Sequence, residues 1–182
     1  MTKGNFEFQT KLSTGDTMAE NLKKNASNLR KESLKETFAE FENVEHRLEF
    51  VANVHGIEYI NDSKATNVNS SWYALERMSR QTVWIVGGVD KTVDYAPLQE
   101  LAKEKVRALV YIGTDKSKIF DNFLDKVDMI VDANSMEEAV QMAYYIADKG
   151  ETVLLSPASA SFNMFENLEE RGNTFKKVVR SL

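Results

Sequence analysis

The spacing of apolar residues changes along the chain, from a helical spacing near its start to short continuous runs later. Two groups in residues 1–45 recur at helical spacing: Met18, Leu22, Ala26 and Leu29, then, after a break, Leu34, Phe38 and Phe41. This pattern predicts two short amphipathic helices. Apolar residues are sparse here, so we expect these helices to pack against the main body, a partner or sequence outside this chain.

From residue 46 onward, β-rich runs alternate with helical patterns. The runs 47–54 and 57–60 flank His55-Gly56, which predicts a β-hairpin. Four later apolar runs are continuous, as in strands buried on both faces, and lie at 83–86, 108–112, 129–131 and 153–155. Helical patterns lie at 67–79, 95–105, 115–125, 135–148 and 163–181. The alternation predicts a Rossmann-like, doubly wound α/β domain with a mostly parallel sheet, a leading β-hairpin and an N-terminal helical appendage.

Composition narrows the class of protein. The 182 residues carry a net charge of −5 and include two histidines and no cysteine. The lack of cysteine excludes a disulfide framework, a thiol nucleophile and a thiolate metal site, and two histidines do not favour a multi-histidine metal site. A pI of about 5.2 argues against a nucleic-acid or anionic-membrane surface. The apolar runs are too short to span a membrane and no secretory signal opens the chain, so we expect a cytoplasmic protein.

Three polar loops follow strands of the predicted sheet, at 61–67, 87–91 and 156–162. Ligands of open parallel sheets bind beyond the carboxyl ends of the strands, so these loops are the candidate site. In the first loop, Asp62 could hydrogen-bond a ribose hydroxyl and Lys64 could neutralise a phosphate or carboxylate. Thr66 precedes a predicted helix, where backbone N–H groups favour anions. The alternative interpretation is a helix-capping loop with one solvated charge pair.

The other two loops and the start of the hairpin offer further cations and hydroxyls. Gly87-Gly88 permits a tight turn, and Lys91 could bind a carboxylate, although the same residues suit an ordinary turn. Ser161 lies near the start of the last predicted helix, where it could face an anion or cap the helix. Arg47 could clamp a phosphate or pair with a nearby glutamate. Together these residues predict a cationic pocket, without a P-loop or a dinucleotide fingerprint.

Five motifs along the chain resemble the Mur ligase family, and most closely its D-glutamate-adding branch. In order, they are Val44-Glu45-His46-Arg47-Leu48-Glu49, Asn61-Asp62-Ser63-Lys64-Ala65-Thr66-Asn67, Gly87-Gly88-Val89-Asp90-Lys91 with Asp94-Tyr95, Leu154-Leu155-Ser156-Pro157-Ala158 through Ala160-Ser161-Phe162, and Glu170-Arg171-Gly172. The resemblance implies that residues 46–182 are the C-terminal Rossmann-like domain of such a ligase. It implies that residues 1–45 are a remnant of the central ATPase domain.

The resemblance also implies an activity. Such an enzyme uses ATP and Mg²⁺ to join D-glutamate to UDP-N-acetylmuramoyl-L-alanine through an acyl phosphate, in peptidoglycan synthesis. The UDP-binding domain and most of the ATPase domain lie outside this chain. We therefore expect the chain alone to be inactive and to hold no tightly bound cofactor and no metal.

Individual positions acquire roles from the resemblance. Arg47 and Asp62 match nucleotide contacts, to phosphate and ribose respectively, and Lys64 matches a nucleotide-side cation with a catalytic, intermediate-stabilising role. The D-glutamate contacts match Thr66, Lys91, Ser161, the backbone of Phe162 and Leu168, which stands where the family usually has an aromatic residue.

The chain also departs from the family pattern. Ser159 replaces a usual cysteine, Asn163 an aspartate and Thr92 a glycine, and residues 11–18 lack a His-Asn pair and a further Asn expected near the adenine. Two alternatives therefore stay open. One is a Mur ligase that adds another amino acid, and the other is a non-catalytic binding module derived from a ligase.

Overall fold

The computed structural model of the chain describes residues 14–39, 44–87, 93–113, 116–160 and 164–182; within the first helix it describes side chains only at 20–35. The chain divides into two compact units, Met1–Ala39 and Glu40–Leu182. The division falls a few residues before the predicted boundary at 45/46.

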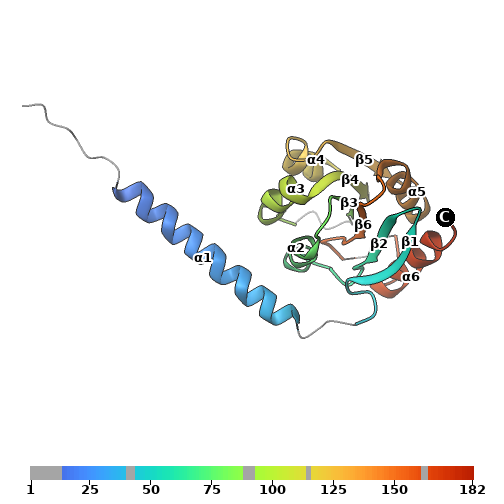
Figure 1. Cartoon of the computed structure of the whole chain (residues 1–182), viewed down its shortest axis with the longest axis horizontal. Helices are drawn as coiled ribbons and strands as arrows, with labels where there is room; N and C mark the ends of the chain where they lie inside the picture. The colour runs from blue at the N-terminus through green and yellow to red at the C-terminus, as the bar shows by residue number, and fades with distance from the viewer. Residues whose placement is uncertain (1–13, 40–43, 88–92, 114–115, 161–163) are drawn as a thin grey trace, which may run out of the picture. The chain divides into compact units, whose positions relative to one another are not determined.

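The first unit contains one helix, α1, at Thr14–Ala39 (Figure 1). The prediction of two short helices is therefore wrong. The segment between the two apolar groups, Arg30–Ser33, contains no glycine or proline, and arginine, lysine and glutamate favour helix. The apolar stripe changes face there, but the backbone continues. Leu22 and Leu29 of this stripe are exposed, at 64% and 68%.

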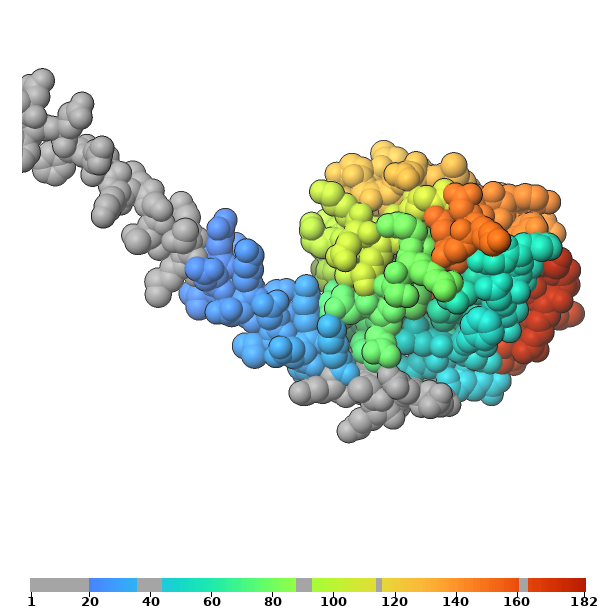
Figure 2. Space-filling view, viewed as in Figure 1, coloured from blue at the N-terminus to red at the C-terminus, as the bar shows by residue number. Residues whose placement is uncertain are grey.

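The second unit begins with the predicted hairpin. Strand β1 (Glu49–Val54) pairs antiparallel with β2 (Ile57–Asn61). The connecting residues His55 and Gly56 have φ angles of 52° and 90°, as a type I′ turn requires. Tyr144 contributes to holding this turn, because its hydroxyl lies 2.9 Å from His55 Nδ1. The β1–β2 hairpin (cyan) and the last helix (red) lie side by side on the surface in Figure 2.

A six-stranded sheet organises this unit, in the order β1-β2-β6-β3-β4-β5. The later strands are β3 (Thr82–Val86), β4 (Val106–Ile112), β5 (Met129–Ala133) and β6 (Thr152–Leu155). All pairs except β1–β2 are parallel. The predicted strands are confirmed, with ends within two residues of those expected. The mostly parallel Rossmann-like fold class is confirmed as well.

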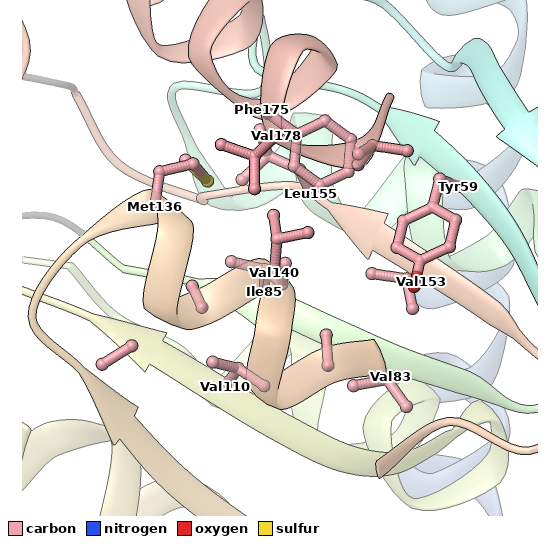
Figure 3. Close-up of a cluster of buried hydrophobic side chains, with 14 of the residues drawn as sticks. Tyr59, Val83, Ile85, Val110, Met136, Val140, Val153, Leu155, Phe175 and Val178 are labelled. Carbon is pink, nitrogen blue, oxygen red and sulfur yellow. The ribbon is translucent and has the colours of Figure 1, made fainter. Parts of the chain in front are cut away.

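Helices cover both faces of the sheet (Figure 1). They are α2 (Val68–Arg77), the 3-10 turn η1 (Ala96–Leu98), α3 (Gln99–Lys105), α4 (Ser117–Phe123), α5 (Met136–Ile146) and α6 (Leu168–Val179). On one face, α5 and α6 pack over alternate strand residues such as Ile85 and Val153 (Figure 3). On the other, Trp84 meets Phe123 of α4 edge to face at 5.6 Å. Each large side chain buried here contributes roughly 1.5–3 kcal/mol.

None of the helices in the described ranges is long and apolar enough to cross a membrane.

The last helix begins later than its apolar pattern predicts, at Leu168 rather than 163. Asn167 caps it, because its side-chain oxygen accepts from the backbone N–H of Glu170 at 2.7 Å. Glu170 in turn accepts from the backbone N–H of Glu166 at 2.6 Å. An asparagine followed three residues later by a glutamate is a helix-start signal, and this signal, not the apolar residues before it, sets the start of α6.

Tyr59 offers a test of the core. It is fully buried, and its ring packs 6.5 Å from that of Phe175. Its hydroxyl is the only buried side-chain N or O atom among the described residues without a hydrogen-bond partner. We expect Tyr59→Phe to raise the free energy of unfolding by about 1 kcal/mol, because an unsatisfied buried hydroxyl is removed. Urea unfolding measures this. Tyr144→Phe, which removes a hydroxyl that has a partner, should not stabilise. A loss of stability in Tyr59→Phe would show that the Tyr59 hydroxyl makes a stabilising contact.

Candidate functional site

The strand order brings the three candidate loops together. Strands β2, β6 and β3 are neighbours in the sheet and run parallel. The loops after Asn61, Leu155 and Val86 therefore leave the same edge side by side. Direct hydrogen bonds join them: Asp62 N–H donates to Leu155 O at 2.8 Å, and Gly87 N–H to Pro157 O at 3.1 Å. The predicted convergence is confirmed for the parts of the loops that the structure describes.

Asp62 is buried within this loop cluster, with 3% of the residue exposed. One carboxylate oxygen accepts from the backbone N–H of Leu48 at 3.3 Å and the other from the Ser156 hydroxyl at 2.9 Å. Ser156 is also 2.8 Å from the hydroxyl of Ser71. Burial raises the pKa of Asp62 to about 7, although the Ser156 and Leu48 hydrogen bonds and the charges of Arg47 and Arg171 lower it. A ribose contact would have to use the lone pairs that these donors leave.

Lys64 lies in the same loop but is exposed. Its backbone is fixed, because Lys64 N–H donates to His46 O at 3.0 Å and Thr66 N–H donates to Lys64 O at 2.9 Å. Thr66 is partly buried and stands two residues before α2, which Asn67 caps through Ser70 N–H at 3.0 Å. An exposed ammonium on a fixed backbone can meet an anionic ligand without rearrangement of the loop.

Arg47 lies close enough to Asp62 for its charge to lower the pKa of that carboxyl. The two glutamates nearest to Arg47 in the chain, Glu45 and Glu49, both accept from the ammonium of Lys176 on α6, at 2.8 Å and 3.2 Å. Arg47 and Lys64 together supply two cations at this edge, which suits a phosphate.

His46 is a buried residue next to this loop cluster. It is 3% exposed, and its Nδ1 accepts from the amide of Asn61 at 2.9 Å. The amide orientation follows from Asn61 Oδ1, which accepts from Ser63 N–H at 3.1 Å. His46 and Leu48 have φ angles of 62° and 44°, uncommon for residues with a Cβ.

The loop after β6 approaches the loop after β3 closely. The Ser159 hydroxyl donates to Gly87 O at 2.7 Å. Gly87 has a φ of 136°, and a Cβ there would lie 2.2 Å from the carbonyl oxygen of Ile112, so only glycine fits. Ala158 also adopts a positive φ, of 60°. Gly87 therefore makes the close backbone approach that glycine permits, and the rest of the predicted turn, from Gly88 onward, lies outside the described residues. Lys91, Ser161 and Phe162 lie outside the described residues, as do Thr92 and Asn163.

Arg171 is a site residue to which the sequence analysis assigned no role. It lies on α6, is 3% exposed, and donates to Ser63 Oγ at 3.0 Å, Ser63 O at 2.7 Å and Ser159 O at 3.3 Å. Burial lowers the pKa of Arg171 to about 10, while the charge of Asp62 raises it. One signal was available, because Arg171 falls on the apolar stripe of the last helix with Leu168 and Phe175.

Leu168 also reaches this edge, because its carbonyl accepts from the Ser63 hydroxyl at 2.8 Å. It is the first residue of α6. The helix begins seven positions after Ser161, which lies outside the described residues, so the predicted place of Ser161 near a helix N-terminus stays a prediction. No group of three or more histidine, aspartate or glutamate side chains suited to a metal ion occurs in the described part of the chain.

Comparison with known proteins bears on this site. The sequence profile described as "Mur ligase, glutamate ligase domain" matches residues 46–159. A UDP-N-acetylmuramoylalanine–D-glutamate ligase of Christiangramia forsetii is 49% identical over 182 residues, which is 100% of this chain and 41% of that protein. A ligase of the same name from Porphyromonas gingivalis is 48% identical over 167 residues, 92% of this chain and 37% of that protein. The chain thus spans about two-fifths of the length of these relatives.

Solved structures agree on the fold. A UDP-N-acetylmuramate-alanine ligase from Thermotoga maritima superposes with a TM-score of 0.52 at 13% identity, over 78% of this chain and 31% of that one. A bifunctional folylpolyglutamate synthase/dihydrofolate synthase from Yersinia pestis, complexed with AMPPNP and Mn ion, gives 0.52 at 17% identity, over 76% and 31%. The profile covers well over half of the chain, and the chain belongs to the Mur ligase family, of which it carries the glutamate ligase domain.

Proposed function

We propose that this chain is the C-terminal part of an ATP-dependent cytoplasmic ligase that joins D-glutamate to UDP-N-acetylmuramoyl-L-alanine in peptidoglycan synthesis. The observation that carries the proposal is the 49% identity to a ligase of that name along all 182 residues. On this proposal, residues 1–45 come from the central ATPase domain and residues 46–182 form the C-terminal domain. The remaining domains supply the UDP-sugar site and most of the ATP and Mg²⁺ site.

The proposed reaction has two steps. The substrate carboxylate attacks the γ-phosphorus of ATP, which releases ADP and leaves an acyl phosphate. The amine of D-glutamate then attacks the acyl carbon, loses a proton, and expels phosphate to form the amide. Since both steps gather negative charge in one place, cations with fixed positions and a bound, oriented amine are the main requirements.

The described residues meet part of these requirements. Arg47 and the exposed Lys64 stand at one edge and are the candidates to neutralise phosphate charge. We place D-glutamate among Thr66, Lys91, Ser161, the backbone of Phe162 and Leu168. Asp62 remains a candidate for the ribose, but its burial and its two hydrogen bonds favour a role in ordering Arg47 and the loop.

A chimera tests this proposal. The aligned segment of the Christiangramia forsetii ligase, 41% of its length, is replaced by these 182 residues. We expect the chimera to release ADP in the presence of UDP-N-acetylmuramoyl-L-alanine only when D-glutamate is added. The chain alone should release none. Release with L-alanine or L-lysine in place of D-glutamate would instead identify a ligase for another amino acid. A folded chimera without any release would favour the non-catalytic module.

Lys91 provides a test of the amino-acid site within that chimera. We expect Lys91→Ala to raise the KM for D-glutamate about 10- to 100-fold, because one charge-assisted hydrogen bond to a carboxylate is worth roughly 1.5–3 kcal/mol. The KM for ATP should change little. Lys103→Ala, at an exposed position on α3, is the matched control. Steady-state kinetics with varied D-glutamate decide the matter, and an unchanged KM would remove Lys91 from the site.

A further inference from the structure

We infer that the guanidinium of Arg171 is the positioning group that holds the three loops of the candidate site in one arrangement. This inference rests on the proposed function, because it assigns those loops to nucleotide and D-glutamate. Arg171 reaches the site from α6, a helix that follows all three loops in the chain. Each of its three side-chain nitrogens donates to a protein oxygen, so we assign it a positioning role rather than a contact with substrate.

On one side, the guanidinium of Arg171 fixes the loop that carries Lys64. Ser63 is fully buried, and its hydroxyl accepts from Arg171 Nε at 3.0 Å while it donates to Leu168 O at 2.8 Å. The Ser63 carbonyl accepts from Arg171 Nη2 at 2.7 Å. Every polar atom of Ser63 is therefore used, since its N–H donates to Asn61 Oδ1 at 3.1 Å. These bonds also hold the backbone of the next residue, Lys64, in place.

On the other side, the same guanidinium reaches the loop after β6. Arg171 Nη1 donates to Ser159 O at 3.3 Å, and the Ser159 hydroxyl donates to Gly87 O at 2.7 Å. The second bond extends the connection to the loop after β3, four residues before Lys91. Where the family usually has cysteine, a thiol would donate more weakly than this hydroxyl. Ser159 therefore strengthens the connection in this chain.

The geometry of the contacts requires arginine. The acceptors Ser63 Oγ, Ser63 O and Ser159 O are met by three different nitrogens of one planar group. A lysine would keep the charge that faces Asp62, but its single nitrogen cannot reach the same three positions. Arg171→Lys thus separates the positioning role from the charge.

Kinetics in the chimera test the inference. We expect Arg171→Lys to raise the KM for D-glutamate and to lower kcat, each about tenfold or more, because small misplacements of aligned groups are costly. The KM for UDP-N-acetylmuramoyl-L-alanine, which binds outside this chain, should stay within twofold. A general loss of folded protein would lower kcat and leave both KM values unchanged. Arg180→Lys, at the exposed end of the same helix, is the matched control.

Ser63→Ala keeps the test decisive if Arg171→Lys does not fold, because it removes only the hydroxyl between Arg171 and Leu168. It should shift the same KM in the same direction, by about threefold. The effect of the double variant should be smaller than the product of the two single effects, since both changes break the contact between Arg171 and the Ser63 hydroxyl. Values of kcat and of the D-glutamate KM within twofold of the parent in Arg171→Lys, or in Ser63→Ala where Arg171→Lys does not fold, would overturn the inference.

Amide hydrogen exchange on the 182-residue chain separates this inference from the proposed function. In Arg171→Lys, we expect the N–H groups of Lys64 and Gly87 to exchange about tenfold faster, while that of Val110 in the core keeps its protection. This result would support the inference even if the parent chimera were inactive and the proposed function failed. Unchanged exchange at Lys64 and Gly87 would contradict the positioning role whatever the activity.

Discussion

Gly172→Ala should destabilise the second unit by about 3 kcal/mol, although alanine normally favours helix. Gly172 lies in α6 against the ring of His46, and an added Cβ would stand 2.3 Å from Nδ1 and 2.9 Å from Cε1 and Cγ. The ring cannot move away easily, because it is buried and accepts the Asn61 hydrogen bond. Urea unfolding of the 182-residue chain measures the loss.

Two further variants identify the cause of that loss. Asn173→Ala, at the next and exposed position of α6, should change stability by less than about 0.5 kcal/mol. In a His46→Ala background the ring is absent, so the added methyl of Gly172→Ala should cost little or stabilise by up to about 1 kcal/mol. An equal loss in both backgrounds would show that the methyl group meets something other than His46.

Asp62→Asn should change how stability depends on pH. The pKa of Asp62 is raised from 3.8 to about 7. Below about pH 4 the carboxyl is protonated in both states, and it makes no difference. Between about pH 4 and pH 7 only the native state keeps the proton, so the free energy of unfolding falls as pH rises. Above about pH 7 both states are ionised and the loss is complete.

The size of this effect follows from the rise of the Asp62 pKa from 3.8 to about 7, which corresponds to roughly 4 kcal/mol. Asparagine keeps the shape and does not titrate. The stability of Asp62→Asn minus that of the parent should therefore rise by about this amount between pH 4 and pH 8. Taking the difference cancels the other titrating groups. Asp121→Asn, at an exposed position of α4, should give a flat difference. If the stability difference between Asp62→Asn and the parent did not change with pH, burial would not raise the pKa of the Asp62 carboxyl.

The sheet was predictable because its strands are buried on both faces. Runs such as 83–86 and 153–155 are continuously apolar, and His55-Gly56 marks a two-residue turn. The helices were harder to bound. A change of apolar face in α1 looked like a break, and apolar residues before Asn167 looked like the start of α6. In both cases the backbone followed capping and helix propensity rather than the apolar stripe.

The exposed residues of the site could be predicted from their residue types, but its buried residues could not. Lys64 draws attention because it lies in a polar loop after a strand, at the edge of the sheet where ligands bind, and Arg47 because its guanidinium can clamp a phosphate. Arg171 does not, since a helix of a soluble domain commonly carries arginine on its solvated face. Its burial depends on Ser63 and Ser159, more than 100 and 12 residues away in the chain. The order of β2, β6 and β3 in the sheet brings these three residues together.

The central claim is that this chain completes a D-glutamate ligase. The most direct measurement is mass spectrometry of the product made by the chimera with the Christiangramia forsetii ligase, supplied with ATP, UDP-N-acetylmuramoyl-L-alanine and D-glutamate. We predict UDP-N-acetylmuramoyl-L-alanyl-D-glutamate, formed at a rate within about tenfold of the intact relative, because the two segments are 49% identical. A folded chimera that yields no such product, beside an active intact ligase, would contradict the claim.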